Sequence, residues 1–221
     1  MIYCMSDIHG EYDRFISMLR FIDFSGADTL YILGDVIDRG HDGIKILECV
    51  IKHSNMIMIL GNHEEMCLQT LGPRHQFGAK QLWIQNGGHS TYQDLVYRRN
   101  HTERNEIIQY LSKLPDALNI QVNNRAFHLV HGMPSFHSDA QKCHEIRLWG
   151  RPNDTTYLPI PNTIAIIGHT PTVYLNQNHT GLYEIWRGDD IICIDCGCGH
   201  MNVENRRLAC IRLDDMSEFY I

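Results

Sequence analysis

The stretch IYCMSDIHG, residues 2–10, joins a short apolar run to a polar cluster, and this unit recurs along the chain. Further runs rich in Ile, Val and Leu cover residues 30–33, 56–60, 127–130, 164–167, 191–194 and 208–213. Runs of this length and composition are typical of buried strands. Helical spacing of apolar residues separates the first three runs, at Phe15, Met18, Leu19 and Ile22 and then at Ile44, Leu47 and Ile51. The first part of the chain is therefore predicted to have the order βαβαβ.

The remainder of the chain predicts a helical insertion and a second sheet. Residues 71–118 are polar with helical spacing, are interrupted by Asn86-Gly87-Gly88 and end near Pro115. The later apolar runs predict a second sheet, either mixed or antiparallel, stacked on the first. Since no repeat or linker-like stretch divides the sequence, we expect one domain over residues 1–221.

Bulk properties exclude some classes of protein without naming a function. Hydrophobic residues make up 43% and charged residues 20% of the 221 positions, which is ordinary for a globular chain. The formal net charge of −7 gives no basic surface for a nucleic-acid backbone, and no apolar run is long enough to span a bilayer. We therefore expect no nucleic-acid or membrane partner and, without a secretion signal, a cytoplasmic location.

The eight cysteines are expected to be reduced thiols, because a chain of this length does not need disulfides to fold. Cys193, Cys196, Cys198 and His200 stand close together in the sequence, and thiolates with an imidazole can hold zinc. Their spacing fits no common zinc module. Small core and turn residues are the preferred interpretation of this cluster.

Five of the apolar runs end in a polar cluster, which is the strongest functional signal in the sequence. The clusters are SDIHG (6–10), GDVIDRG (34–40), GNHE (61–64), HG (131–132) and GHT (168–170). Ligands of open α/β sheets bind at the carboxyl ends of strands, where glycines permit sharp turns. One such cluster is ordinary turn chemistry, but five together predict a shared site. The histidines outside these clusters, His179 among them, are expected to be ordinary side chains.

The residue types in these clusters favour a pair of metal ions. Carboxylates, imidazoles and an amide suit Mn, Fe or Zn. Asp7 and His9, two positions apart at a strand end, can share one ion. Asp35 has two oxygens and can bridge two ions about 3.5–4 Å apart. The second ion would complete its ligand set with Asn62, His131 and His169.

The order of these motifs resembles the metal-dependent phosphoprotein phosphatase family, especially its compact bacterial and bacteriophage lambda-type members. Residues 83–88 (WIQNGG) and 194–197 (IDCG) are similar to further segments of that subgroup, so the resemblance spans nearly the whole chain. It implies the α/β fold of calcineurin-like metallophosphoesterases, a sandwich of two stacked mixed β-sheets flanked by helices. It also implies two divalent ions, with manganese preferred and iron or zinc as alternatives.

Carried over by position, the resemblance implies the same six metal ligands and adds four further roles. His63 would be the general acid and Asp38 its carboxylate partner, while Arg39 would bind phosphate. These roles fit the chemistry, since a histidine titrates near neutrality and an arginine fork matches phosphate oxygens. Arg147 and Arg151 are candidates for a second phosphate-binding arginine. The segment 148–151 (LWGR) resembles the family's arginine segment, which favours Arg151, and Arg147 is expected to form an ordinary ion pair.

Two positions depart from the patterns of related sequences. Ser6 stands where the first motif usually has glycine, a change that is tolerated unless the turn requires a positive φ. Pro171 stands where many nucleases and nucleotidases of the wider superfamily have a second histidine, which favours the phosphatase branch.

The predicted reaction is hydrolysis of a phosphate monoester by direct attack of a metal-bridging hydroxide, with His63 protonating the leaving oxygen. The substrate is expected to be a phosphorylated protein, mainly on serine or threonine, or a small phosphoester. A symmetrical diadenosine tetraphosphatase or another nucleotide polyphosphate hydrolase is the alternative, since such enzymes share these motifs. Base stacking or polyphosphate binding could then use Tyr92, Tyr97, Arg98 and Arg99, although a solvated helix face explains them equally well. A scaffold without turnover is disfavoured, because every ligand position and the candidate acid are present.

Overall fold

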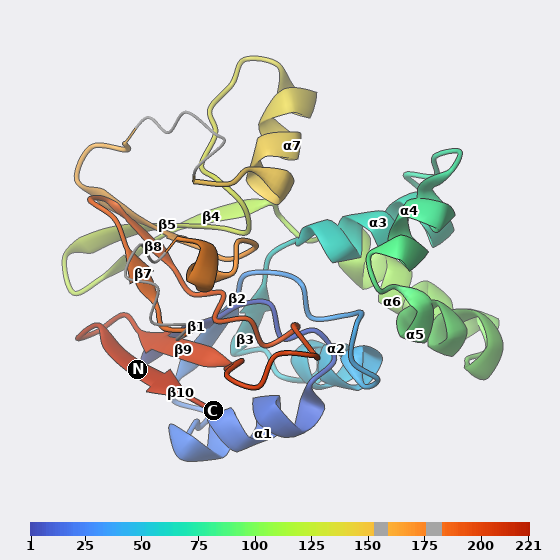
Figure 1. Ribbon diagram of the computed structural model, residues 1–221, viewed down its shortest axis with the longest axis horizontal. Coiled ribbons are helices and arrows are strands. Elements are labelled where there is room, and N and C mark those ends of the chain that lie inside the picture. The colour runs from blue at the N-terminus through green and yellow to red at the C-terminus, as the bar shows by residue number, and fades with distance from the viewer. Residues whose placement is uncertain (153–158, 176–182) are drawn as a thin grey trace.

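The chain forms a sandwich of two five-stranded sheets with helices on its outside (Figure 1). The computed structural model describes residues 1–152, 159–175 and 183–221. Both sheets contain parallel and antiparallel neighbours, so the expected fold of two stacked mixed sheets is confirmed. The first sheet has the order β10 (Ser217–Tyr220), β9 (Ala209–Arg212), β1 (Ile2–Met5), β2 (Thr29–Ile32) and β3 (Met56–Met58). The second has the order β4 (Ala117–Val122), β5 (Arg125–Val130), β6 (Thr163–Ile167), β8 (Ile191–Cys193) and β7 (Trp186–Arg187).

The first three strands are parallel and are joined by α1 (Tyr12–Phe21) and α2 (Gly43–Lys52), which confirms the predicted βαβαβ order. Helix α1 buries Phe15 and Met18, the apolar positions that predicted it. Parallel strands end at the same edge of a sheet, so the loops after β1, β2 and β3 meet there. Strands β5, β6 and β8 of the second sheet are also parallel to one another.

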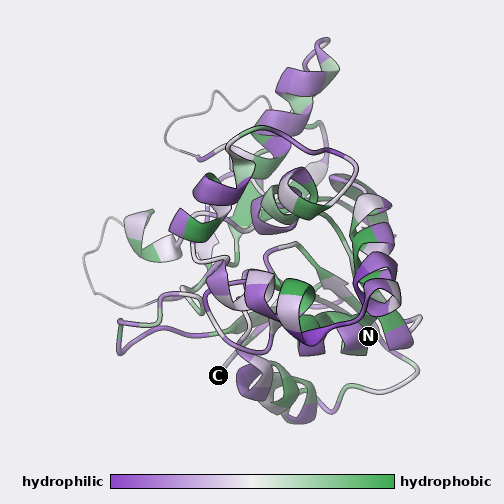
Figure 2. Cartoon of the chain, turned by 90° about the vertical axis from the view of Figure 1, so that its right-hand side faces the viewer, coloured by the Kyte–Doolittle hydropathy of each residue, from purple (hydrophilic) through white to green (hydrophobic). Residues whose placement is uncertain are grey.

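Alternating side chains of the strands build separate hydrophobic layers. In β1, Cys4 packs between the two sheets, whereas Tyr3 and Met5 face the helices on the other side. In β5, Phe127 and Leu129 enter the layer between the sheets. The helical segments carry both hydrophobic and hydrophilic positions, as Figure 2 shows. Because successive side chains of a strand point to opposite faces of the sheet, each sheet packs against neighbouring elements on both faces.

A group of helices follows β3 and lies to one side of the sandwich (Figure 1). Helix α3 begins at Asn62, directly after β3, and β4 already begins at Ala117, so the helical region starts and ends earlier than residues 71–118. The break predicted at residues 86–88 separates α4 from α5. The helices of this region are α3 (Asn62–Leu71), α4 (Ala79–Gln85), α5 (His89–Gln93), a π-helical turn (Asp94–Arg98) and α6 (His101–Ser112).

Several elements have no apolar run that would have predicted them. Strands β4, β7 and β10 lie at sheet edges, and few of their side chains are buried. Helix α7 (Ala140–Trp149) buries only Cys143 and Leu148. Among the helices that the structure describes, none is both long and apolar enough to cross a membrane.

Candidate metal centre

All five polar clusters meet at the carboxyl ends of the strands. The loops after β1 and β2 carry Asp7, His9 and Asp35, and α3 begins with Asn62. The loops after β5 and β6 carry the remaining two candidate ligands, His131 and His169. All six side chains are buried, the most exposed being His169 at 8%.

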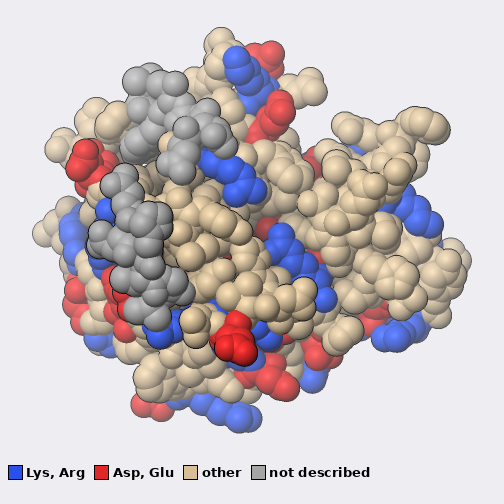
Figure 3. Space-filling view, viewed as in Figure 1, with Lys and Arg blue, Asp and Glu red and all other residues tan. Residues whose placement is uncertain are grey.

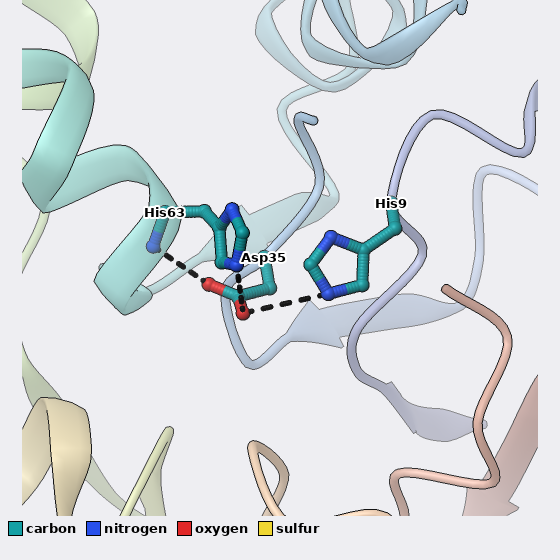
Figure 4. Close-up of side chains that lie close together, drawn as sticks. All are labelled: His9, Asp35 and His63. Atoms are coloured by element: carbon teal, nitrogen blue, oxygen red, sulfur yellow. Dashed lines mark hydrogen bonds and ion pairs between the residues drawn. The ribbon is translucent and has the colours of Figure 1, made fainter. Parts of the chain in front are cut away.

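The Asp35 carboxylate lies at the centre of this arrangement (Figure 4). Its Oδ2 atom is 3.6 Å from His9 Nε2, 3.8 Å from His63 Nε2 and 3.4 Å from His131 Nε2. These separations are long for hydrogen bonds. They approach the spacing of about 3.0–3.4 Å between two ligands bonded to one ion at about 2.1 Å. Asp35 therefore belongs to both groups of atoms that could hold a metal, His9–Asp35–His63 and Asp35–His131–His169.

The imidazole of His131 shows why a cation suits this centre. Its Nδ1 donates to the Leu33 carbonyl oxygen at 2.6 Å, which leaves a lone pair on Nε2 in the neutral ring. That Nε2 faces two acceptors, Asn62 Oδ1 at 2.8 Å and Asp35 Oδ2 at 3.4 Å. A positive charge between them removes the repulsion of the lone pairs. Although burial opposes it, the Asp35 and Asp7 carboxylates accordingly raise the pKa of His131 to about 10.

The other two imidazoles are prepared as neutral ligands. His9 Nδ1 donates to the Ile37 carbonyl oxygen at 3.1 Å, and its Nε2 is 3.9 Å from Asp7 Oδ1. The Nε2 atoms of His9 and His169 are buried and have no hydrogen-bond partner among the described residues. Burial lowers the pKa of both histidines well below its usual range. Neutral imidazoles with a free lone pair are the form that binds a metal, so the residues present fit a divalent ion.

The loops that carry the site have a strained backbone. Positive φ angles occur at Asp7 (52°), His9 (47°), Asp35 (53°) and His169 (63°), in a region that non-glycine residues rarely adopt. Ser6 is not among the residues with positive φ, which explains how the first turn tolerates a side chain there. Strain of this kind persists only where the surroundings fix the backbone, and it is frequent at functional sites.

Glu64 helps to hold the strained backbone of these loops in place. The sequence-based prediction gave it no role. Its carboxylate is fully buried and accepts hydrogen bonds from the backbone N–H groups of Asp35, Val36, Ile37 and Gly61 at 2.8–3.3 Å. Burial and the nearby Asp35 charge raise its pKa to about 7. The GNHE motif contains this residue, but only the structure reveals what its side chain holds.

His63 and Asp38, the predicted acid and its partner, are in direct contact. His63 Nδ1 is 2.6 Å from Asp38 Oδ2, and Arg39 Nη2 is 3.4 Å from His63 Nε2. Burial opposes the charged imidazole, but the Asp35 and Asp38 carboxylates outweigh it and raise the pKa of His63. The same Asp38 oxygen accepts a hydrogen bond at 2.6 Å from Trp83 Nε1, a partner that the sequence did not predict.

The two arginines proposed from the sequence to bind phosphate are both close to this centre. The Arg39 charge contributes to the lowered pKa of His9, and the Arg151 charge contributes to that of His169. Arg147 instead donates to Asp116 Oδ1 at 2.9 Å, the ordinary ion pair expected for it.

The cysteines near the centre are free thiols with separate partners. Cys193 Sγ donates to the Thr170 carbonyl oxygen at 3.1 Å, and Cys198 Sγ to that of Ile8 at 3.6 Å. Within the described residues, the groups of side chains that could hold a metal contain no cysteine. The prediction for His179 lies outside the described residues.

Comparison with known proteins identifies the family of this chain. The model of the family described as Calcineurin-like phosphoesterase matches residues 1–196. The chain belongs to this family. Among solved structures, this calcineurin-like phosphoesterase resembles a metallophosphoesterase from Sphaerobacter thermophilus, with a TM-score of 0.58, 18% identity and coverage of 100% and 87% of the two chains. It also resembles a protein serine/threonine phosphatase from Saccharomyces cerevisiae, with a TM-score of 0.61, 15% identity and coverage of 100% and 78%.

Curated relatives of this phosphoesterase carry two different names. Serine/threonine-protein phosphatase 2 of Escherichia coli (strain K12) is 31% identical over 134 residues, which cover 59% of this chain and 57% of the relative. A symmetrical bis(5'-nucleosyl)-tetraphosphatase of Chromobacterium violaceum is 42% identical over 65 residues, or 28% of this chain and 24% of the relative. The matched stretches thus span less than two thirds of these relatives, so neither name fixes the substrate.

Proposed function

We propose that this chain is a metal-dependent protein phosphatase that hydrolyses phosphoserine and phosphothreonine. The observation that carries the proposal is the Asp35 carboxylate, which belongs to both groups of candidate ligand atoms. We propose two divalent ions, manganese first, held by the six predicted ligands. When bound, such ions acidify water and neutralise phosphoryl oxygens. The eight free cysteines are consistent with the cytoplasmic setting that we also propose.

The remaining chemistry is assigned to side chains of this chain. Arg39 and Arg151 bind and orient the phosphate through their guanidinium groups. Because Nδ1 of His63 donates to Asp38, the nitrogen that releases a proton is Nε2. In this mechanism His63 protonates the departing serine or threonine oxygen, while water attacks from the opposite side of the phosphorus. No covalent phosphoenzyme forms.

A groove beside the metal centre supports a polypeptide substrate. It has a volume of about 1080 Å³ and lies between α7 and the helices α3 and α4, where Figure 3 shows a notch in the surface. Trp149 lines this groove, and its ring centroid is 5.9 Å from that of His169. A phosphorylated side chain could therefore reach the centre while its neighbours lie in the groove.

The charges of the groove favour a peptide over a polyphosphate. Its cations Arg74 and His144 both pair with Glu65, and His144 also pairs with Asp116, so two carboxylates balance these two charges. Gln69, Gln76 and Gln141 add amides that can bond to a peptide backbone. A polyphosphate chain would need unpaired cations instead.

A nucleotide polyphosphate remains the second candidate substrate because a smaller pocket adjoins Arg39. This pocket of about 470 Å³ is lined in part by His200 and Met201, which could contact a base. Arg99, considered above for polyphosphate binding, pairs with Glu48 and Asp94. Its charge is thus balanced on the helical surface, which weakens that assignment.

The direct test compares substrates with the manganese-loaded protein. Phosphoserine, phosphothreonine and phosphotyrosine peptides and diadenosine tetraphosphate are assayed side by side for kcat/KM. We expect the phosphoserine and phosphothreonine peptides to be preferred. A large preference for the dinucleotide would overturn the proposed substrate, and hydrolysis that survives exhaustive chelation would overturn the metal requirement.

Variants at the centre separate metal binding from proton transfer. Asp35→Asn should lose metal and activity together, because it weakens the shared ligand. His63→Asn should retain metal but lose about 10²–10⁴-fold in rate on substrates with poor leaving groups. Metal content by atomic spectroscopy and rates on an alkyl phosphate measure both. Equal metal loss in the two variants would contradict the assigned roles.

Substitutions in the groove beside α7 and in the pocket beside Arg39 test which class of substrate each of them binds. Leu82→Ala removes an exposed side chain of the large groove and should raise KM for phosphopeptides without changing hydrolysis of p-nitrophenyl phosphate. Met201→Ala should impair only the dinucleotide. Phe21→Ala, at an exposed position of α1 outside both pockets, is the matched control.

A further inference from the structure

The segment around the break between α4 and α5 is hydrogen-bonded to the loop that carries Asp38, the partner of the candidate acid His63. Trp83, Gly87, Ser90 and Thr91 of the helical region form hydrogen bonds with residues 38–40. Three hydrogen bonds join the two segments: Asp38 N to Thr91 Oγ1 at 3.0 Å, Arg39 N to the Gly87 carbonyl oxygen at 3.0 Å, and Ser90 Oγ to the Gly40 carbonyl oxygen at 2.8 Å. The helical region therefore holds the catalytic loop as well as lining the groove.

A fourth contact reaches the carboxylate itself. Trp83 Nε1 donates to Asp38 Oδ2 at 2.6 Å, the oxygen that His63 Nδ1 also approaches to 2.6 Å. Asp38 Oδ1 is buried and has no hydrogen-bond partner among the described residues. Two donors therefore converge on a single oxygen of a fully buried carboxylate.

The indole N–H of Trp83 can only donate a hydrogen bond, so the Asp38 oxygen that it contacts must accept. It stabilises Asp38 Oδ2 as a charged acceptor, since hydrogen bonds to an ionised carboxylate are about twice as strong as neutral ones. A charged Oδ2 in turn favours a proton on Nδ1 of His63. In the imidazolium form, the opposite nitrogen Nε2 carries the second proton, and this is the proton that reaches the leaving group.

The indole is held in one orientation by its surroundings. Trp83 is fully buried, and a Cβ atom on Gly88 would lie 2.4 Å from its Nε1 and Cδ1 atoms. Tyr92 forms a T-shaped ring contact with Trp83 at a centroid distance of 6.0 Å. This close packing opposes rotation of the N–H away from Asp38.

We propose that Trp83 is a positioning residue for the general acid, holding Asp38 so that the Nδ1 proton of His63 stays in place and Nε2 faces the phosphate. The proposal rests on the proposed function, because it takes His63 as the acid. The hydrogen bond itself can be tested without any turnover.

That first test uses the indole N–H signals in a ¹⁵N-labelled protein. The three tryptophans give three signals, and Trp83→Phe identifies the one from Trp83. Asp38→Asn should move this signal upfield by removing its charged acceptor and leave the Trp186 signal in place. An unmoved Trp83 signal would overturn the inference while leaving the proposed phosphatase activity untouched.

The second test measures dependence on the leaving group. Trp83→Phe should lower kcat on phenyl phosphate about ten-fold with little change in KM, as expected for partial loss of general-acid catalysis. Hydrolysis of 2,4-dinitrophenyl phosphate, whose leaving group needs no proton, should be unaffected. Trp186→Phe provides the same substitution on the edge strand β7, outside the loop that carries Asp38. If Trp83→Phe does not fold, 3-benzothienylalanine at position 83 keeps the ring shape and removes only the donor.

A double-variant cycle distinguishes positioning from general structural damage. In a His63→Asn background, adding Trp83→Phe should cause no further loss on phenyl phosphate, because the route through the acid is already broken. Two losses that multiply, or an equal loss on both aryl phosphates, would overturn the inference. Absence of phosphopeptide hydrolysis by the unmodified protein would instead contradict the proposed function alone.

Discussion

Replacing Gly168 by alanine should damage the metal centre through a steric clash. A Cβ atom at this position would lie 1.9 Å from Ser6 Oγ and 2.3 Å from Asp7 Oδ2. Both neighbours are buried, with 2% of their surface exposed, so they have no solvent to move into. Overpacking of this kind costs about 1–3 kcal/mol. Each kcal/mol lowers the melting temperature of a chain of this size by about 2–4 °C.

Thermal unfolding in the presence of a chelator measures the cost to the fold, and calorimetric titration with Mn²⁺ measures the cost to the site. We expect both a lower melting temperature and weaker binding, since Asp7 must move. Gly26→Ala is the matched control, because nothing lies within 4 Å of a Cβ atom there. Adding Ser6→Gly should restore part of the loss by removing the nearer contact. A Gly168→Ala protein with unchanged melting temperature and Mn²⁺ affinity would refute the reasoning.

Two further predictions concern residues beside the centre. The Asp116 carboxylate, which accepts a hydrogen bond from His144, and the Glu65 carboxylate raise the pKa of His144 from 6.5 to about 9, so its stabilisation is complete below pH 6.5 and is lost as the pH rises through 9. His144→Gln should accordingly lower the melting temperature at pH 6 and have no effect at pH 10, whereas an equal effect at both would contradict the ion pair. Thr91→Val leaves the buried N–H of Asp38 without its acceptor and should lower the free energy of unfolding by about 1–3 kcal/mol. Urea unfolding measures this change, and an unchanged free energy of unfolding would show that another acceptor replaces the threonine.

The sequence was most informative where one local rule decided the outcome. Apolar runs located β1 and β2, which lie in the interior of the first sheet, and also the edge strand β3, whose Met56 and Met58 side chains are buried. The polar residues after them could be grouped into one site because parallel strands end at a common edge. The edge strands β4, β7 and β10 escaped prediction, because few of their side chains are buried.

The sequence alone did not identify the residues that act on the site through other residues. Glu64 stands beside two recognised site residues, but an acidic residue in the first turn of a helix is usually explained by the helix dipole. Trp83 stands in the segment 83–88 that resembles the phosphatase family, but that resemblance assigned no role to its side chain. Its partner Asp38 is 45 positions away, and only the fold brings the two together.

The strained loops hold the candidate ligands of the centre in a fixed arrangement. Positive φ angles at Asp7, His9, Asp35 and His169 each cost roughly 1 kcal/mol or more, and they would relax in a flexible loop. The Glu64 carboxylate opposes this relaxation by holding the N–H groups after β2. The stability of the sandwich thus maintains a cluster of acceptors that repel one another. Binding a cation would then relieve that repulsion without reorganising the loops, which is the electrostatic preorganisation that hydrolysis of a phosphate requires.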